Sequence, residues 1–311
     1  MYDKKVSVII VTYNSMKWLK QCLNSLRKSL YRLRIVVIDN CSKDDTVSFL
    51  QQQPDIHLII NKKNRGFGQA NNQGIEYAFS QKADFFFLLN QDAYIHPDTI
   101  NKLIETYTKH PDVSIITPVH LNGKGSGIDP YFRDFVLAQC PEYLTDGILY
   151  NIQRNYVCKN VPAAGWFFPK KTIKEIGGFD PIFFHYGEDD NYLKRLEYHH
   201  RIVMMDTQSF IRHDRESTVG NRHVFLHKKN RRDLLMIATD ITKDRHFIIQ
   251  KLGRQFTSNL TLNLFYLCTG KFKNMWNFCG DFLFLFSNRL SIKNSRMNNK
   301  QCKTNWISNI Q

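Results

Sequence analysis

The 311-residue sequence lacks several patterns that mark common classes of protein. It contains no uninterrupted run of about 18 apolar residues, so we expect no transmembrane helix. Its first residues lack the apolar core of a secretory signal peptide. The seven cysteines are scattered and include no C-x-x-C pair, which disfavours a zinc knuckle or a disulfide framework. These absences predict a cytoplasmic protein in a reducing environment.

The two commonest nucleotide-binding motifs are also missing. Residues 64–74 (N-R-G-F-G-Q-A-N-N-Q-G) resemble a loop that cradles phosphate. However, Asn71 breaks the G-x-G-x-x-G pattern, and no G-K-[ST] is present. A dinucleotide-dependent oxidoreductase and a P-loop NTPase are therefore poorly supported. The small residues of this segment still allow a ligand to approach the backbone closely.

Acidic residues are scarce in the last third of the chain. The whole sequence has 43 Lys and Arg against 28 Asp and Glu, a net charge of +15. The last 91 residues hold 16 of these basic residues and only 4 of the acidic ones, a surplus of 12, so the first 220 residues are nearly balanced. Such a surplus attracts nucleic acid or an anionic membrane. No RNP-like or zinc pattern accompanies it, so nucleic acid is the weaker alternative.

The chain divides into three expected regions. Residues 1–224 carry the strand and helix signals of one larger domain. Residues 225–290 interleave aromatic and basic residues at helical spacing. They predict a helical extension that lies on an anionic membrane surface, with a solvated helix face as the alternative. Residues 291–311 are rich in Asn, Lys and Ser and are predicted to form a mobile tail.

Strand and helix signals alternate along the first 120 residues. Short β-branched or aromatic runs predict strands, and apolar residues at helical spacing between them predict helices. The expected strands cover residues 6–11, 35–38, 57–60, 85–89 and 113–117, followed by 161–169 and 202–205. This order is typical of an α/β fold with a Rossmann-like, mostly parallel sheet and helices on both faces. Residues 121–160 are expected to form an irregular loop.

Polar residues follow four of the predicted strands. Ligands of open parallel sheets bind at the carboxyl ends of the strands, so these residues are candidates for a binding site. They are Thr12, Tyr13, Asn14, Asp39, Asn40, Asn64, Asn90, Gln91 and Asp92. Helix caps explain any one of them alone, but four successive polar strand ends favour a site. The N-x-D triplet at 90–92 offers oxygen ligands that suit Mg²⁺ or Mn²⁺, with a capped turn as the alternative.

Three adjacent carboxylates, Glu188, Asp189 and Asp190, stand at the start of a predicted helix. The helix dipole favours acids at this end, which is the simplest explanation for them. Aromatic rings at residues 183–186 precede them, and burial beside such rings raises the pKa of a carboxyl group, which suits a general base. His213, after a later strand, is either a structural histidine or a ligand of the cation or of phosphate.

These motifs, taken in order and spacing, resemble those of a family 2 glycosyltransferase with the GT-A fold, and in particular its rhamnosyltransferase-like branch. The resemblance covers roughly residues 5–240. It rests on V-S-V-I-I-V-T-Y-N, V-V-I-D-N-C-S-K-D-D-T, N-R-G-F-G-Q-A-N-N-Q-G, N-Q-D, A-A-G-W-F-F-P, G-G-F-D-P-I-F-F-H-Y-G-E-D-D-N-Y-L-K-R and the later His213.

The resemblance implies a role for each candidate residue. Asp189 would be the catalytic base, with Glu188 beside it, and Asp92 and His213 would hold Mn²⁺ or Mg²⁺. Trp166 and Asp190 would contact the acceptor, although core packing explains Trp166 equally well. The nucleotide-sugar donor would lie against Thr12, Tyr13, Asn14, Asp39, Asn40, Asn64, Arg65, Gly66, Asn72, Asn90 and Gln91.

The implied reaction is a single displacement that inverts the anomeric centre of a sugar. The donor would be dTDP-rhamnose or a UDP-sugar. The acceptor would be a saccharide or a lipid-linked saccharide in bacterial cell-surface polysaccharide synthesis, at the inner face of the plasma membrane. Asn90 and Asn191 replace acids that are common in the family. They support a second hypothesis, a catalytically inactive sugar-nucleotide-binding or scaffold protein of the same fold.

Overall fold

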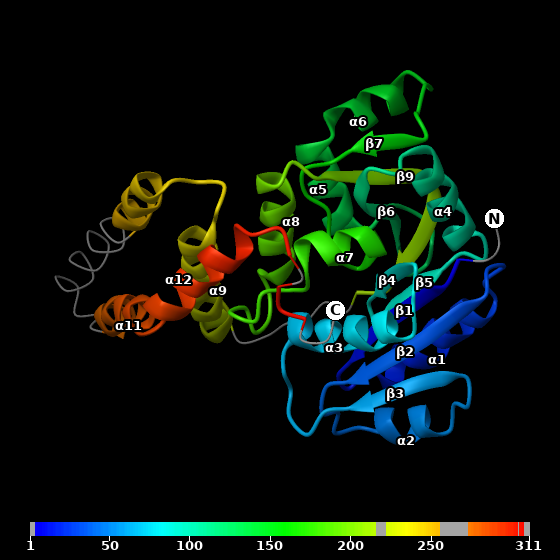
Figure 1. Cartoon of the computed structure of the whole chain (residues 1–311), viewed down its shortest axis with the longest axis horizontal. Helices are drawn as coiled ribbons and strands as arrows, with labels where there is room; N and C mark the ends of the chain where they lie inside the picture. The colour runs from blue at the N-terminus through cyan, green and yellow to red at the C-terminus, as the bar shows by residue number, and fades with distance from the viewer. Residues whose placement is uncertain (1–3, 216–221, 256–272, 304, 308–311) are drawn as a thin grey trace.

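The computed structural model describes residues 4–215, 222–255, 273–303 and 305–307. The first part of the chain alternates strands and helices in the order that the sequence predicts (Figure 1). Its elements are β1 (Val6–Thr12), α1 (Met16–Arg27), β2 (Leu33–Asp39), α2 (Thr46–Gln51), β3 (Ile56–Ile60), α3 (Phe67–Ser80), β4 (Phe85–Leu89), β5 (Ala93–Ile95), α4 (Thr99–Lys109) and β6 (Val113–Asn122).

The second part contains more regular structure than the sequence predicts. Its elements are α5 (Pro130–Gln139), α6 (Pro141–Ile148), β7 (Asn155–Val157), β8 (Gly165–Pro169), α7 (Lys170–Ile176), α8 (Glu188–Tyr198) and β9 (Ile202–His213). The expectation of an irregular loop over residues 121–160 is wrong, because the two helices α5 and α6 and the strand β7 lie there. Both helices begin with proline at the first position, a start signal that composition alone conceals.

One nine-stranded sheet organises the domain, in the order β3-β2-β1-β4-β8-β6-β9-β5, with β7 also paired to β9. Strands β3, β2, β1 and β4 are parallel, as expected. Beyond β4 the sheet is mixed, because β8 inserts between β4 and β6 and runs antiparallel to both. The predicted α/β fold is confirmed, and parallel pairing returns in the second half between β6 and β9. An apolar run specifies a buried strand but not its direction.

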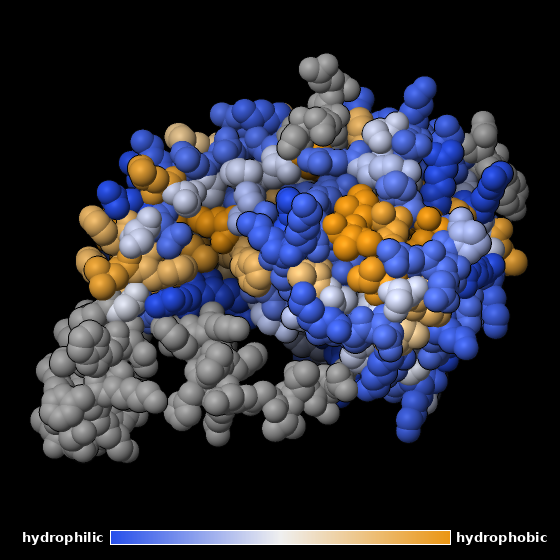
Figure 2. Space-filling view, turned by 90° about the horizontal axis from the view of Figure 1, so that it is seen from below, coloured by the Kyte–Doolittle hydropathy of each residue, from blue (hydrophilic) through white to orange (hydrophobic). Residues whose placement is uncertain are grey.

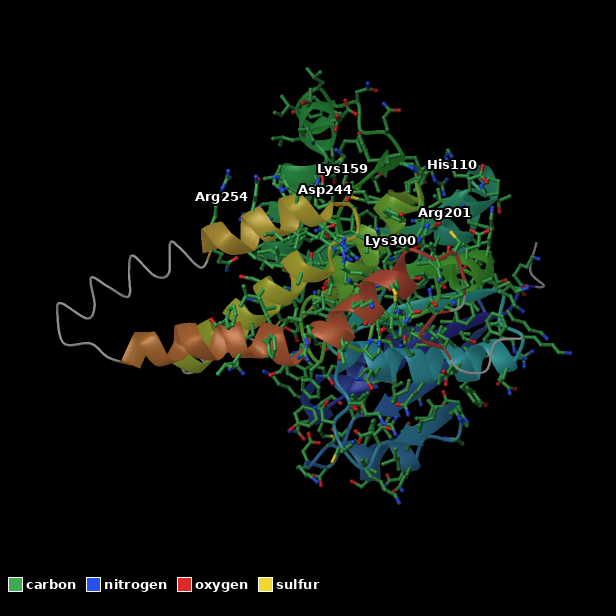
Figure 3. The ribbon with its side chains drawn as sticks, turned by 60° about the vertical axis from the view of Figure 1, so that its left-hand side comes forward. His110, Lys159, Arg201, Asp244, Arg254 and Lys300 are labelled. Atoms are coloured by element: carbon green, nitrogen blue, oxygen red, sulfur yellow. The ribbon has the colours of Figure 1, made fainter. Side chains whose placement is uncertain are left out.

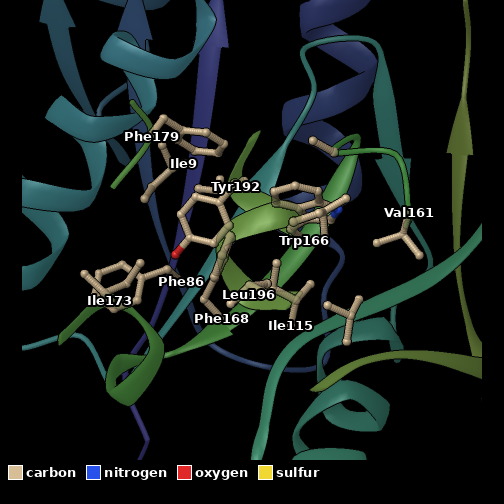
Figure 4. Close-up of a cluster of buried hydrophobic side chains, with 14 of the residues drawn as sticks. Ile9, Phe86, Ile115, Val161, Trp166, Phe168, Ile173, Phe179, Tyr192 and Leu196 are labelled. Atoms are coloured by element: carbon tan, nitrogen blue, oxygen red, sulfur yellow. The ribbon is translucent and has the colours of Figure 1, made fainter. Parts of the chain in front are cut away.

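The sheet is buried on both faces, as the apolar runs predict. Along β4 the side chains alternate, so that Phe86 and Leu88 enter one core and Phe85, Phe87 and Leu89 enter the other. Helices α3, α5, α7 and α8 cover the first face, and α1 and α4 cover the second. Figure 4 shows the first core around the aromatic rings of β8 and α8. The two layers hold the carboxyl ends of β1, β2 and β4 at one edge.

The C-terminal helices stand beside this domain, on the left of Figure 1. They are α9 (Arg222–Thr239), a helix over residues 245–255, α11 (Lys273–Ser287) and α12 (Arg289–Asn299). Figure 3 shows the helix over residues 245–255 running from Asp244 outward to Arg254. The expected helical extension is therefore present among the described residues. None of the helices within the described ranges has both the length and the apolarity that a bilayer span requires.

The end of the chain is anchored to the sheet domain. In α12, the Ser295 hydroxyl and the Asn299 amide both donate to the buried carboxylate of Asp180, the latter over 2.7 Å. After it, Gly178 N–H donates to the Asn305 carbonyl over 2.8 Å, and Ile307 enters the core with 6% of its surface exposed. The prediction of a mobile tail over residues 291–311 is wrong for its described part, because polar composition conceals these long-range contacts.

Candidate active site

Asp39, at the end of β2, organises the first loops of the site. Its buried carboxylate accepts hydrogen bonds from the Thr12 hydroxyl (3.0 Å) and from the backbone N–H groups of Cys41 (3.1 Å) and Ser42 (3.0 Å). The Ser42 hydroxyl donates to it as well, and accepts from the Asn14 N–H over 2.9 Å. Asp39 and Thr12 therefore tie the ends of β1 and β2 together.

Tyr13 is the exposed aromatic side chain of this edge, with 46% of its surface accessible. Its backbone N–H donates to the Gln91 side-chain oxygen over 2.8 Å, which joins the end of β1 to the N-Q-D turn after β4. The Asn14 side chain accepts from the Lys43 N–H over 2.8 Å. Tyr13, Asn14 and Gln91 thus lie on adjoining loops, as the sequence predicts, and the Tyr13 ring is free to stack on a ligand.

A second group of hydrogen bonds shapes the loop before α3. The Asn40 amide donates to Asn64 Oδ1 (2.8 Å) and to the Gly66 carbonyl (3.2 Å), and its oxygen accepts from the Arg65 N–H (3.0 Å). Gly66 has a φ of +82°, and a Cβ there would lie 1.8 Å from the Phe184 carbonyl oxygen. Only glycine fits this position, where the loop meets the segment that leads to the three acids.

Asn72 does not join this group. Its amide donates to the carbonyls of Phe179 (2.8 Å) and Trp306 (3.2 Å), and its oxygen accepts from the Phe179 N–H (2.7 Å). Both donors of this buried amide are therefore used to hold backbone segments. The prediction that Asn72 lines the sugar-diphosphate is wrong in this structure, because its side chain is already hydrogen-bonded to the backbone of Phe179 and of Trp306 in the C-terminal segment.

The candidate metal ligands converge at the opposite end of this edge. Antiparallel pairing of β5 with β9 sets Ala93 opposite His213, so that Asp92 Oδ1 lies 3.3 Å from His213 Nε2. The amide nitrogen of Asn90 lies 3.4 Å from the same His213 nitrogen. The Asn90 Oδ1 atom is buried and has no hydrogen-bond partner among the described residues. Distant parts of the chain therefore meet here, as expected.

The chemistry of these three side chains suits a divalent cation. A carboxylate, an imidazole and an unpartnered amide oxygen are donors that Mn²⁺ and Mg²⁺ accept, and both ions leave positions for phosphate oxygens. Within the described part of the chain, no three or more His, Cys, Asp or Glu side chains form a cluster that could hold a metal ion. The protein ligands would thus be few, with the remaining positions left to a bound ligand.

Sequence reasoning missed Asp129 and Arg215. Asp129 caps α5 by accepting from the Phe132 N–H (2.8 Å), and its second oxygen lies 2.9 Å from Arg215 Nε and 4.0 Å from His213 Nδ1. The buried Asp129 therefore holds Arg215 and places a negative charge near His213. The Asp-Pro pair at positions 129 and 130 could have revealed it, because this pair is typical of the start of a helix. The composition of the surrounding segment predicts a loop instead.

The acidic residues open α8 from a left-handed Gly187 (φ +96°). Burial, and then the charge of Asp189, raise the pKa of Glu188 to about 8. Glu188 Oε2 has no hydrogen-bond partner within the described ranges. Burial, and then the charge of Asp190, raise the pKa of Asp189 to about 6. At neutral pH Asp189 is therefore mostly ionised and Glu188 mostly protonated. A dipole effect alone would lower both values, so it does not account for this arrangement.

Tyr131 connects the acids to the metal-ligand edge. Its ring centroid lies 4.7 Å from the guanidinium carbon of Arg215. Burial, and then the charges of Asp189 and Asp190, raise the pKa of Tyr131. Asp190 itself accepts from the Asn160 amide over 3.2 Å. Close approaches thus link Asp92, His213, Asp129, Arg215 and Tyr131, and the charges of Asp189 and Asp190 act on Tyr131 at the end of this series.

Trp166 lies outside this surface. It is fully buried, with 0% of its surface exposed, and its ring is stacked 6.2 Å from that of Phe179. Figure 4 shows it inside the core cluster. The prediction that Trp166 stacks on an acceptor sugar is wrong in this structure, since β8 is a central strand covered on both faces. The equally weighted alternative of core packing is the one observed.

Two solved structures have a fold similar to that of this chain. The mannosyltransferase PcManGT from Pyrobaculum calidifontis, solved with GDP-Man and Mn²⁺, has a TM-score of 0.57 at 15% identity and covers 94% of this chain and 76% of its own. Residues 1–349 of TarS from Staphylococcus aureus, solved with UDP, have a TM-score of 0.53 at 18% identity and cover 95% and 90%. These similarities establish the GT-A fold alone.

Curated relatives match the N-terminal part of the chain. The poly(ribitol-phosphate) beta-N-acetylglucosaminyltransferase TarS from Staphylococcus aureus is 30% identical over 129 residues, which are 39% of this chain and 22% of that protein. The chondroitin synthase from Escherichia coli is 26% identical over 121 residues, 38% of this chain and 17% of that protein. The chain thus matches only about a fifth of the length of these relatives. The family model described as glycosyl transferase family 2 matches residues 7–177, more than half of the chain, and the protein therefore belongs to that family.

Proposed function

We propose that this protein transfers a sugar from a nucleotide-sugar donor to a hydroxyl group of a saccharide acceptor, with inversion at the anomeric carbon. The proposal is supported by the Asp92–His213 pair and by the acidic start of α8, whose charges raise the pKa of Tyr131 beside Arg215. The raised pKa of Asp189 leaves a carboxylate whose basicity is close to working pH. A general base is most effective in that range.

In the proposed reaction, Asp189 accepts the proton of the acceptor hydroxyl as that oxygen attacks the sugar. Glu188 is protonated at neutral pH, so it adds no second negative charge beside the attacking oxygen. Asp190 is held by Asn160 and would orient the acceptor. A direct displacement needs no enzyme nucleophile, since the base alone activates the acceptor.

On the donor side, Tyr13, Asn14 and the loops held by Asp39 and Asn40 would bind the nucleotide. The backbone at Gly66 would approach the diphosphate. Asp92, His213 and Asn90 would hold a divalent cation, which supplies positive charge to the leaving diphosphate. Either dTDP-rhamnose, from the resemblance of the N-x-D turn, or a UDP-sugar, as in the UDP complex of TarS, is the proposed donor. Because this chain matches only part of its relatives, donor and acceptor remain part of the proposal.

The proposed location is the inner face of a bacterial plasma membrane, where the acceptor would be a saccharide or lipid-linked saccharide for a surface polysaccharide. The support is an exposed apolar face of the C-terminal helices, formed by Phe282, Leu283, Phe286 and Leu290. Arg289 stacks on Phe286 with 4.2 Å between guanidinium carbon and ring centroid. Figure 2 shows apolar atoms gathered over these helices on its left. Flotation with phosphatidylglycerol vesicles tests this location, and equal flotation with neutral vesicles would contradict it.

The deciding experiment measures release of nucleoside diphosphate. Purified protein is incubated with UDP-, dTDP- and GDP-sugars and a saccharide acceptor, with and without Mn²⁺. We expect release from one donor, dependent on the cation and lost in Asp189→Asn. Binding of a nucleotide sugar without release, in wild type and variant alike, would favour the inactive scaffold that the Asn90 and Asn191 substitutions suggest.

A further inference from the structure

A strongly basic groove lies beside the candidate active site, and none of its residues has been given a role above. It has a volume of about 810 Å³ and runs between α1, β5 and the turn after β6. Five exposed cations line it: Lys17, Lys20, Lys28, Lys124 and Arg212. The described residues that line it include no Asp or Glu. Its histidine, His96, already pairs with Asp98 over 2.6 Å.

The lysines of α1 form a single stripe. Positions 17, 20, 21, 24 and 28 share one helix face, because they follow the spacing of 3, 4, 7 and 11 residues from Lys17. Helix α1 contains no acidic residue, so this face carries a net positive charge. The stripe therefore presents its positive charge to one side of the groove.

The groove opens next to the candidate metal ligands. Tyr94 lines it, and the Tyr94 hydroxyl lies 3.3 Å from a carboxylate oxygen of Asp214. The backbone N–H of Asp214 in turn donates to the Asp92 carbonyl over 2.8 Å. Arg212, two residues away along β9, covers the Tyr94 ring with its guanidinium carbon 5.8 Å from the centroid. A chain that lies in the groove would therefore end close to Asp92.

The size of the groove suits a chain rather than a single ion. Lys17 and Lys28 are 11 residues apart, which is about 16 Å along a helix. Lysine attracts an anion as a point charge, whereas arginine adds bidentate recognition of carboxylate or phosphate. Four of the five cations of the groove are lysines, which suits a chain of anionic groups held by charge.

We propose that this groove binds the acceptor, and that the acceptor is a polyanionic chain with repeated anionic groups. This inference rests on the proposed function, because it assigns the substrate class of the same site. The basic residues line a concave groove, which a flexible polymer can enter and a flat membrane surface cannot. The membrane-facing surface proposed above lies on the C-terminal helices, away from β5.

The test uses the full chain and a labelled inorganic polyphosphate as probe, followed by fluorescence anisotropy. The groove variant is Lys20→Glu/Lys28→Glu, whose lysines are exposed and not paired to any described acid. The control variant is Lys251→Glu/Lys293→Glu in the C-terminal helices, with the same change of net charge. We expect the groove variant to bind polyphosphate at least about tenfold more weakly, with the slope of log K against log salt reduced by roughly 1 to 2. The control should stay within about twofold of wild type.

Equal weakening in both variants would overturn the proposal, because binding would then follow net charge alone. Loss of binding to phosphatidylglycerol vesicles or to single-stranded DNA in the groove variant, with polyphosphate binding unchanged, would also overturn it in favour of those partners. Lys20→Gln/Lys28→Gln, with an intermediate loss expected, is used if the glutamates unfold the protein in a thermal melt. Binding of UDP and dTDP by all variants is measured in parallel. If wild type bound neither UDP nor dTDP, that result would count against the proposed function and not against the proposal that the groove binds a polyanion.

Discussion

Replacement of Glu188 by glutamine tests the electrostatics of the acidic triplet. Glu188 is 4% exposed, and its pKa is raised from 4.5 to about 8, first by burial and then by Asp189. Between these two values the folded protein binds a proton that the unfolded chain has released. The free energy of unfolding of the wild type therefore falls as pH rises from about 4.5 to 8.

The size of this effect follows from the shift. Each pKa unit corresponds to about 1.4 kcal/mol. The raised pKa of Glu188 therefore lowers the free energy of unfolding by about 3 kcal/mol at pH 7, compared with a side chain that does not ionise. Glutamine carries no charge at any pH and avoids this cost. We expect Glu188→Gln to resemble wild type near pH 5 and to become more stable than wild type by roughly 3 to 4 kcal/mol at pH 8.

Urea unfolding of both proteins at a series of pH values measures this difference, in which the titrating groups that do not interact with Glu188 cancel. Glu197→Gln is the matched control on the same helix. Its side chain is 49% exposed and paired with Lys194, so its effect should stay below about 0.5 kcal/mol at every pH. A stability difference between Glu188→Gln and wild type that does not change with pH would refute the reasoning.

Three further predictions address the site and the chain end. Asp189→Asn should lower turnover by at least about a hundredfold, while UDP binding measured by calorimetry persists. The wild-type rate should fall at acid pH around the Asp189 pKa of about 6. Unchanged turnover in the variant would exclude Asp189 as the base. Asp92→Asn should abolish the rise in melting temperature that Mn²⁺ gives with a bound nucleotide, and an undiminished rise would remove Asp92 from the metal site. Ile307→Ala should lower the free energy of unfolding in urea by about 2 kcal/mol, because Ile307 is buried. Met297→Ala, at an exposed position, should lower it by less than about 0.5 kcal/mol. Equally small losses in both variants would mean that the segment around Ile307 is not anchored.

Much of the site could be predicted from local sequence because its residues sit at strand ends. Asp39, Asn90 and Asp92 each follow an apolar strand directly, and the parallel pairing of β1 with β2 and β4 brings those ends together. His213 lies beside Asp92 because β9 pairs with β5, and the sequence does not predict this pairing. The raised pKa of the acids comes from their burial and their mutual charge, which the run of three acids partly announces.

Other residues changed role once their neighbours were known. Trp166 and Asn72 belong to motifs of the resemblance, yet one fills the core and the other holds backbone carbonyls. Asp129 enters the site from a segment whose composition resembles a loop. Contacts between positions far apart in the chain decide each of these cases. Such contacts leave no periodic trace in the sequence around any single partner.

The sequence by itself determined the α/β alternation, the buried strands and the polar strand ends, because side-chain periodicity and β-branched runs act locally. Only the tertiary structure decided the direction of β8, the anchoring of Ile307 and the gathering of basic residues from α1, Lys124 and Arg212 into one groove. The surplus of basic residues along the sequence lies in its last third, yet this groove is built from the nearly balanced part. Charge count is additive along the chain, whereas a binding surface depends on which residues folding places side by side.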